Sequence, residues 1–166
     1  MLPYQKVKLV LLGDSYVGKT SFLERVTNSN YITNPSLTTS MKFINFRNNY
    51  ISTPINFQLW DTPGASWHRN TSLHFIKATD AVIVIHDATQ PLDTYMNEWT
   101  TLIRQYNKEC PIFLLHTKSD LISPQEHIIS NSMEYIDIGY VNIHEYLDYN
   151  ELFNDIYTQI KLHRGF

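Results

Sequence analysis

The feature that most constrains the fold of this chain is an eight-residue stretch, Gly13-Asp14-Ser15-Tyr16-Val17-Gly18-Lys19-Thr20. It fits the pattern G-x-x-x-x-G-K-[ST] at every fixed position. In that pattern the glycines let the backbone turn tightly and present N–H groups to an anion, while the lysine supplies a positive charge. The final hydroxyl can ligate Mg²⁺. The stretch therefore predicts a phosphate-binding loop.

The residues on either side of this loop fit the strand–loop–helix order that such a loop requires. Residues Val7–Leu12 form a nearly continuous apolar run, which is typical of a buried parallel strand and predicts a strand over Lys6–Leu12. Phe22, Leu23 and Val26 have the spacing of one helix face and predict a helix from Thr20 to Asn28. The alternative is an ordinary strand–turn–helix that contains Gly-Lys-Thr by chance, and the order of elements argues against it.

Composition sets the broad class of the protein. A length of 166 residues suits one domain, 1–166, and 43% hydrophobic with 17% charged residues is typical of a globular protein. The net charge of −3 and the lack of a Lys/Arg run argue against nucleic-acid binding. Without a signal peptide or a long apolar segment, we expect a cytoplasmic protein. Cys110, the single cysteine, excludes an internal disulfide, and the histidine spacing does not favour a zinc site.

Strand-like and helix-like segments alternate along the chain, which predicts an α/β fold. Asn48-Asn49 is a plausible hairpin turn, and residues 29–40 are expected to form a loop. Open α/β sheets bind ligands at the carboxyl ends of their strands, so we expect the chemistry to lie in the loops there. The expected strands are Lys6–Leu12, Met41–Phe46, Ile51–Trp60, Ala81–His86, Ile112–His116 and Tyr135–Val141, and the expected helices are Thr20–Asn28, Leu92–Lys108, Gln125–Met133 and Tyr149–His163.

A second candidate segment, Asp61-Thr62-Pro63-Gly64, follows the third predicted strand. An aspartate at a strand end can hold the Mg²⁺ shell opposite Thr20, and Gly64 can bring its backbone N–H close to a γ-phosphate. Taken alone, Asp-Thr-Pro-Gly is typical of a simple turn. Its position one hairpin after the phosphate loop favours nucleotide sensing.

A third candidate segment, His116-Thr117-Lys118-Ser119-Asp120, follows the fifth predicted strand. The Asp120 carboxylate can accept hydrogen bonds from the N1–H and N2–H₂ groups of guanine, a pair of donors that adenine lacks. The stem of Lys118 can cover one face of the base. Lys-x-Asp alone is a weak pattern that also occurs in ordinary charged loops.

Together the three segments resemble the Ras superfamily of small GTPases, and most of all its Rab branch. Residues 59–62 (LWDT) are similar to the family's L-W-D-T, residues 86–89 (HDAT) to its Y-D-V-T, and residues 148–153 (DYNELF) to the N-V-E-E-L-F of its last helix. The resemblance covers essentially the whole chain. It implies a three-layer P-loop NTPase fold with a six-stranded, mostly parallel sheet and about five helices. It also implies binding of Mg²⁺ with GTP or GDP, and two nucleotide-sensing switches.

The resemblance assigns ligands residue by residue. It gives the Mg²⁺ site to Thr20, Thr38 and Asp61, with Thr39 as the alternative to its neighbour Thr38. The remaining assignments are residues 13–20 and Gly64 for the phosphates and Thr117, Lys118 and Asp120 for guanine.

Two departures from the Rab pattern concern the phosphate side. Tyr16 replaces a glycine, and a bulky residue there can face outward over the nucleotide or resist a positive φ. Ala65 replaces the glutamine that orients the attacking water, so no catalytic residue is intact and we expect slow intrinsic GTP hydrolysis. An activating protein that supplies its own glutamine would bypass this defect.

Further departures concern the guanine side. Thr117 replaces the asparagine of N-K-x-D and loses an amide that braces the base and the phosphate loop. The S-A-K loop of the family has no counterpart, because the aligned residues 142–144 read Asn-Ile-His. The chain after Asp120 is also several residues short. These changes predict a looser guanine pocket and faster nucleotide exchange.

Three functions remain open from the sequence. The first is a monomeric molecular switch in vesicle trafficking, whose effector, exchange-factor or activating proteins recognise its GTP-dependent loops. The second is a non-cycling scaffold with a Rab fold, including a pathogen mimic of host trafficking proteins, and the third is a P-loop kinase or ATPase. No prenylation motif is present, so we expect membrane association either through a tail outside this chain or by another route. Phe43, Trp60 and Trp67 are either an effector-binding patch or core residues.

Overall fold

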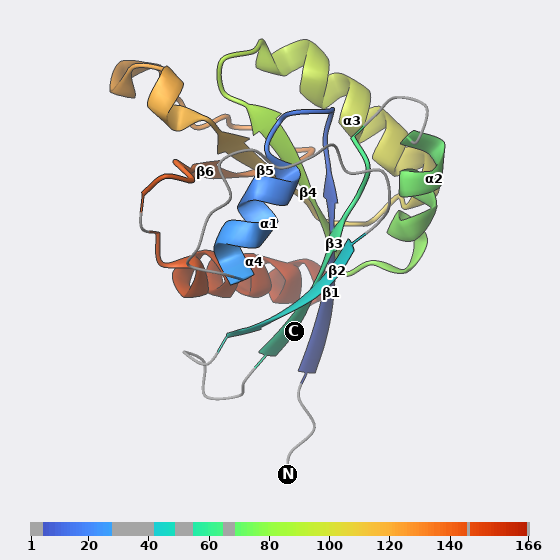
Figure 1. Cartoon of the computed structure of the whole chain (residues 1–166). Coiled ribbons are helices and arrows are strands. Elements are labelled where there is room, and N and C mark those ends of the chain that lie inside the picture. The colour runs from blue at the N-terminus through green and yellow to red at the C-terminus, as the bar shows by residue number, and fades with distance from the viewer. Residues whose placement is uncertain (1–4, 28–41, 49–54, 65–68, 146, 166) are drawn as a thin grey trace.

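The computed structural model describes residues 5–27, 42–48, 55–64, 69–145 and 147–165, and a six-stranded sheet lies at its centre (Figure 1). The strand order is β2-β3-β1-β4-β5-β6. Strand β2 pairs antiparallel with β3, and the other pairs are parallel, which confirms the predicted α/β fold. The strands are β1 (Gln5–Leu12), β2 (Lys42–Asn48), β3 (Ile55–Asp61), β4 (Ala81–Asp87), β5 (Ile112–Thr117) and β6 (Ile136–Tyr140).

Helices cover both faces of this sheet and complete three layers (Figure 1). The described residues form four α-helices, one fewer than the expected number of about five. Helices α1 and α4 pack on one face, and α2 and α3 pack on the other. The helices are α1 (Lys19–Thr27), α2 (Arg69–His74), α3 (Leu92–Tyr106) and α4 (Tyr149–Arg164), with short 3₁₀ turns η2 (Phe75–Ala78), η3 (Ser119–Leu121) and η4 (Pro124–Glu126).

The apolar runs in the sequence correspond to strands that are buried on both faces. All six residues of β5 are buried, as are the first six of β4, because each strand lies between two parallel neighbours and two helix layers. On the α1/α4 face, the Phe57 and Phe153 rings lie 5.0 Å apart. Cys110 is 3% exposed just before β5, as expected for a small apolar core residue.

The pairing register brings the candidate segments to one edge of the sheet. Leu11 of β1 pairs with Asp61 of β3, and Asp87 of β4 pairs with Thr117 of β5. The phosphate loop, the loop after Asp61 and the loop after Thr117 therefore leave the same edge. This is the arrangement predicted from the carboxyl-end rule for parallel strands.

The predicted helix over Gln125–Met133 is wrong. Pro124 starts only one 3₁₀ turn, and Ser123 and Glu126 form a capping box at its N-terminus. The next residues are β-branched isoleucines and a Ser-Asn-Ser run, both of which disfavour a helix interior. Side chains from β6 bind the backbone instead. The Tyr140 hydroxyl lies 3.1 Å from the Ile128 nitrogen, and the Asp137 carboxylate lies 2.7 Å from the Ser130 nitrogen.

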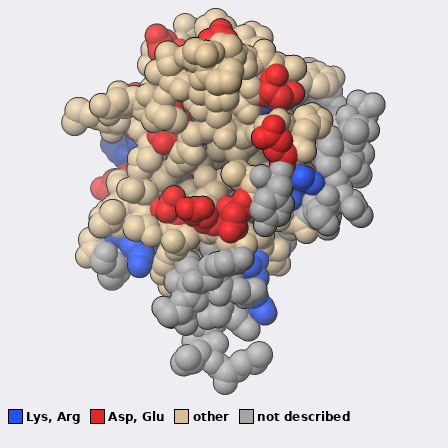
Figure 2. Space-filling model, turned by 90° about the vertical axis from the view of Figure 1, so that its left-hand side faces the viewer, with Lys and Arg blue, Asp and Glu red and all other residues tan. Residues whose placement is uncertain are grey.

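Without that helix, apolar side chains near β6 are exposed, among them Ile128, Ile129 and Met133. Figure 2 views the side on which β6 lies in Figure 1, and it shows acidic side chains gathered there, with Lys and Arg at scattered points. Within the described part of the chain, none of the helices has the length and apolar character needed to cross a bilayer.

Several predictions concern residues outside the described ranges. They are the loop 29–40 with Thr38 and Thr39, the turn residue Asn49, and the residues Ala65 and Trp67. Asn48 itself is the last residue of β2. Trp60 is half-buried, with its ring 5.7 Å from that of Phe75 and beneath the Lys8 ammonium group, so packing against the sheet accounts for its position.

Candidate nucleotide-binding site

The phosphate loop adopts the backbone conformation that its glycines suggest. Gly13 and Gly18 have φ of 143° and 97°, and a Cβ on Gly13 would lie 2.6 Å from the Ile85 carbonyl oxygen. Tyr16 also has a positive φ, 64°, and its side chain is 74% exposed. The bulky residue therefore adopts the unusual backbone conformation and faces outward.

Lys19 is held inside this loop. Its ammonium group donates to the carbonyl oxygens of Gly13 at 2.9 Å and Asp14 at 2.6 Å. Burial lowers the pKa of Lys19 to about 8, although the nearby carboxylates of Asp61 and Asp14 act in the opposite direction. A buried cation in a ring of backbone groups is costly without an anion, so this geometry is suited to binding phosphate.

Thr20 and Asp61 meet beside that lysine. The Thr20 hydroxyl donates to an Asp61 carboxylate oxygen at 2.6 Å, and both side chains are buried. The next residue, Thr62, donates its hydroxyl to the Leu11 carbonyl at 2.7 Å, which ties the end of β3 to β1. A hydroxyl and a carboxylate at one point are oxygen donors of the kind that Mg²⁺ prefers, so these residues fit the ion.

Gly64 lies against the phosphate loop. A Cβ at this position would lie 2.6 Å from the Asp14 carbonyl oxygen and would also clash with the Lys19 ammonium group. Only glycine lets the backbone approach so closely. The backbone after β3 is therefore within reach of a ligand that Lys19 binds.

Thr117 retains part of the brace expected to be lost with the family's asparagine. Its hydroxyl lies 2.5 Å from the Val17 carbonyl oxygen and 3.0 Å from the His86 carbonyl oxygen. One hydroxyl hydrogen serves these two acceptors. The end of β5 is thus still connected to the phosphate loop, through a hydroxyl in place of an amide.

Replacing Thr117 with valine should lower the free energy of unfolding by about 1–2 kcal/mol, because two buried carbonyl groups lose their shared donor while the side-chain shape is kept. Thr117→Ser keeps the hydroxyl and serves as the control. Urea unfolding of the three proteins measures the difference. Equal stability of Thr117→Val and the unaltered protein would show that the brace contributes nothing.

The other guanine-side residues follow β5 directly. Lys118 has a left-handed backbone (φ 58°), and its ammonium group lies 2.5 Å from the Asp87 carboxylate. Burial acts to raise the pKa of Asp87, but hydrogen bonds from Lys118 and Thr89 outweigh it and lower the pKa. Asp120 lies on η3 with its side chain exposed. Residues 142–144 form the turn after β6, where the His144 N–H donates to the Asn142 side chain at 3.0 Å.

Comparison with known proteins agrees with this geometry. Residues 8–120 match the family model described as Ras of Complex, Roc, domain of DAPkinase. The chain is 29% identical to Ras-related protein RabC and 36% identical to Ras-related protein RabF1, both of Dictyostelium discoideum. The RabC match covers 76% of this chain and 67% of RabC, and the RabF1 match covers 70% and 61%. The chain belongs to the Rab-like branch of the Ras superfamily of small GTPases.

This Rab-like chain also matches part of a larger protein. It is 32% identical to a Ras and EF-hand domain-containing protein of Xenopus tropicalis, over 73% of this chain and 18% of that protein. The chain thus spans from about a fifth to two thirds of these relatives. Membership implies guanine-nucleotide binding, together with regulators and effectors of the general kind that small GTPases use.

Sequence reasoning missed two side-chain contacts near this site. Tyr95 of α3 accepts the Asp14 backbone N–H at 3.2 Å and donates to the Ile85 carbonyl at 2.6 Å, which steadies the phosphate loop. His86 and His116, interpreted as scattered histidines, lie side by side in β4 and β5. The sequence predicts both strands but not the register that brings these two rings together.

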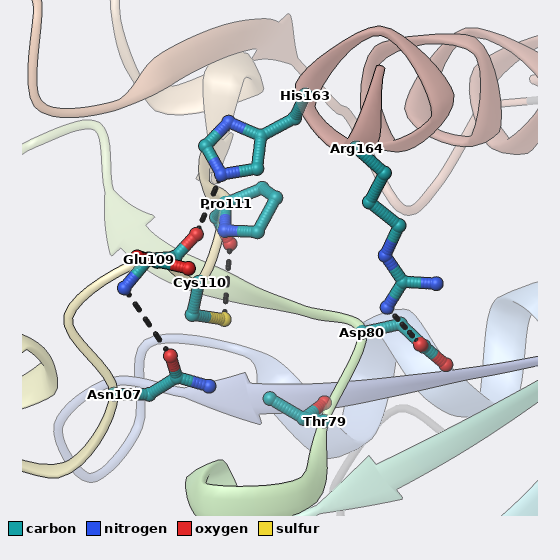
Figure 3. A pocket seen from close by; sticks show the side chains of 8 residues that line it. All are labelled: Thr79, Asp80, Asn107, Glu109, Cys110, Pro111, His163 and Arg164. Carbon is teal, nitrogen blue, oxygen red and sulfur yellow. Dashed lines mark hydrogen bonds and ion pairs between the residues drawn. The ribbon is translucent and has the colours of Figure 1, made fainter. Parts of the chain in front are cut away.

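A cavity of about 490 Å³ lies at the opposite ends of the strands, before β4 and β5 (Figure 3). Its polar groups bind one another. Arg164 pairs with Asp80, and His163 Nε2 lies 2.6 Å from the Glu109 carbonyl oxygen. Burial raises the pKa of the Cys110 thiol in its wall to about 12. These mutual contacts account for the lining without a ligand.

Proposed function

We propose that residues 1–166 form a single guanine-nucleotide-binding domain that acts as a molecular switch in vesicle trafficking. The observation that carries this proposal is the contact of Thr20 with Asp61 at 2.6 Å beside the buried Lys19 ammonium group. Lys118 and Asp120 leave the same edge of the sheet, where the base would lie.

In this proposal each residue has a separate task. Lys19 and the backbone N–H groups of residues 13–20 bind the β- and γ-phosphates, and Gly64 approaches the γ-phosphate. Thr20 and Asp61, with Thr38, hold Mg²⁺, which neutralises phosphate charge when bound. Lys118 covers the base, and Asp120 selects guanine.

The proposed partners follow from the switch. Effectors, exchange factors and activating proteins would recognise loops whose order depends on the γ-phosphate. We propose that the domain acts as a monomer in the cytoplasm and reaches membranes through a tail outside this chain.

The test is to identify the nucleotide that co-purifies with the protein and then to titrate GDP, GTP and ATP in the presence of Mg²⁺. We expect GDP or GTP to co-purify and guanine nucleotides to bind far more tightly than ATP. A preference for ATP would overturn the guanine assignment. Absence of binding to all three nucleotides would favour the non-cycling scaffold.

The scaffold is the second candidate because of particular substitutions. Ala65 lacks the amide that orients water, Thr117 replaces an amide by a hydroxyl, and β5 leads to β6 without a helix. A scaffold would bind its partners equally well with GDP, with a GTP analogue or without nucleotide. Partner binding that depends on the γ-phosphate would contradict it.

Restoring the missing amide by Ala65→Gln should speed intrinsic GTP hydrolysis by about tenfold or more, because a positioned group that activates water contributes at least that much. Single-turnover hydrolysis of bound GTP measures the rate. Ala65→Leu adds similar bulk without an amide and should remain slow. If both variants match the unaltered protein, Ala65 does not limit hydrolysis.

A further inference from the structure

A chain of three buried polar side chains crosses the strands below the guanine-side loops. His86 of β4 and His116 of β5 are register partners, each 2% exposed, with their Nδ1 atoms 3.0 Å apart. The Nε2 atom of His116 lies 3.2 Å from the Asp137 carboxylate of β6. The chain therefore links β4, β5 and β6 just before these strands end.

The protonation of this chain follows from its contacts. Asp137 accepts backbone N–H groups of Ser130 at 2.7 Å and Gly139 at 2.9 Å. Burial acts to raise the pKa of Asp137, but hydrogen bonds from His116, Ser130 and Gly139 outweigh it and lower the pKa, so the carboxylate is ionised. An ionised carboxylate only accepts, so the Nε2 atom of His116 carries a hydrogen.

The two facing Nδ1 atoms need one hydrogen between them. With both rings neutral, His86 carries it and donates to His116. A first added proton leaves the contact closed, because one ring can still point an N–H at the free nitrogen of the other ring. A second proton would set two N–H groups against each other at 3.0 Å, so the contact would have to open. Burial, followed by the effect of His116, lowers the pKa of His86, which resists this second proton.

The groups that face the pair come from several elements and limit how it can take up protons. Asp137 is the ionised partner of His116, and the Tyr140 ring stacks on His116 with centroids 4.2 Å apart. The Tyr95 ring of α3 lies 5.1 Å from His86, and Asp87 is the next residue along β4. Exposed His127 stacks on Tyr140 with centroids 4.6 Å apart, and its Nε2 atom lies 3.3 Å from the Ser119 carbonyl oxygen.

Each strand end at the guanine side is connected to this pair. The His86 carbonyl accepts the Thr117 hydroxyl, and the His116 carbonyl accepts the Val141 N–H at 2.8 Å, at the start of the turn 142–144. Asp87, the residue after His86, binds the Lys118 ammonium group at 2.5 Å. Separation of the two rings would thus displace the residues that follow β4, β5 and β6 together.

We propose that His116 is a positioning residue for the guanine-side loops, and that uptake of a second proton by the His86–His116 pair, which opens their contact, speeds nucleotide release. The inference rests on the proposed binding of guanine nucleotides. The proton comes from solvent and no covalent bond changes. Acid therefore opens the guanine side of the pocket while the phosphate loop keeps its contacts.

The experiment is to measure the release rate of a fluorescent GDP from pH 8 to pH 5.5. Release should rise by about tenfold as the pH falls. A difference of about one unit between the pKa of the pair in the closed and in the open form changes the equilibrium between these forms by a factor of ten. His116→Gln keeps a donor and an acceptor but does not titrate in this range, so its release rate should be independent of pH. His127→Gln is the matched control and should keep the rise.

Unfolding must be separated from release. Burial lowers the pKa of His86, so its neutral ring stabilises the fold above the ordinary histidine pKa of about 6.5, and this contribution is lost as the pH falls. Circular dichroism at pH 5.5 therefore has to show that the protein is still folded. If His116→Gln does not fold, nitrogen NMR of the unaltered protein decides. We expect a hydrogen on His116 Nε2 throughout and coupled titration of the two rings.

Three results would overturn this inference. The first is release of GDP that does not change with pH in the unaltered protein. The second is an equal rise in His116→Gln, and the third is independent titration of the two rings. Failure to bind any guanine nucleotide at any pH would instead remove the proposed function.

Discussion

Lys19→Ala should weaken the binding of GDP and GTP by about a hundredfold or more. The lysine is 5% exposed, and its ammonium group lies between the carbonyl oxygens of Gly13 and Asp14, where the loop backbone would enclose phosphate. Hydrogen bonds to charged groups contribute about 1.5–3 kcal/mol each, and the lysine would make at least two to the phosphates. Fluorescence titration with labelled GDP and Mg²⁺ measures the loss.

The control for Lys19 is another lysine of the same region. Lys6 is exposed on β1, so Lys6→Ala removes the same charge without touching the loop and should bind GDP normally. Thermal unfolding of both variants checks that the fold is retained. A folded Lys19→Ala protein whose affinity falls less than about threefold would contradict the assignment of Lys19 to the phosphates.

The phosphate side of the site was largely predictable from the sequence because its signals are local. The β1 run, the two glycines and Lys19 lie within fifteen residues of one another. The meeting of Thr20 with Asp61 is not local, yet it follows from a general rule, since parallel strands bring their carboxyl ends to one edge. A strong motif and a topological rule together were enough to place these residues.

The region after Asp120 was less predictable because tertiary contacts decide its structure. Residues 125–133 were predicted to form a short helix, but the Tyr140 and Asp137 side chains bind the backbone at Ile128 and Ser130, where the chain has no regular secondary structure. Those partners come later in the chain and give no local signal. The sequence is several residues shorter here than the family pattern, and the described residues between β5 and β6 form no α-helix.

The histidine pair illustrates the same limit. His86 and His116 are thirty residues apart, and their contact depends on the register between β4 and β5. A shift of one residue would turn one ring to the opposite face of the sheet. Sequence alone gives the two strands but not their register, so the contact required the structure.

Asp120→Ala should lower the affinity for GDP by about a hundredfold or more and leave the weak affinity for ADP unchanged, so that discrimination between the two bases is lost. The left-handed backbone at Lys118 turns the chain so that Asp120 follows on η3, while the Lys118 ammonium group is fixed by Asp87. An exposed carboxylate there can accept both guanine donors, and each hydrogen bond to a charged group contributes about 1.5–3 kcal/mol.

The comparison with ADP makes this result specific. Loss of a phosphate contact would weaken GDP and ADP alike, whereas loss of a base contact weakens GDP alone. Asp155→Ala removes the same charge from an exposed position on α4 and should bind both nucleotides normally. If Asp120→Ala and Asp155→Ala show the same ratio of GDP to ADP affinity, another group selects the base. The turn at residues 142–144, after β6, would then be the next segment to alter, because it leaves the same edge of the sheet.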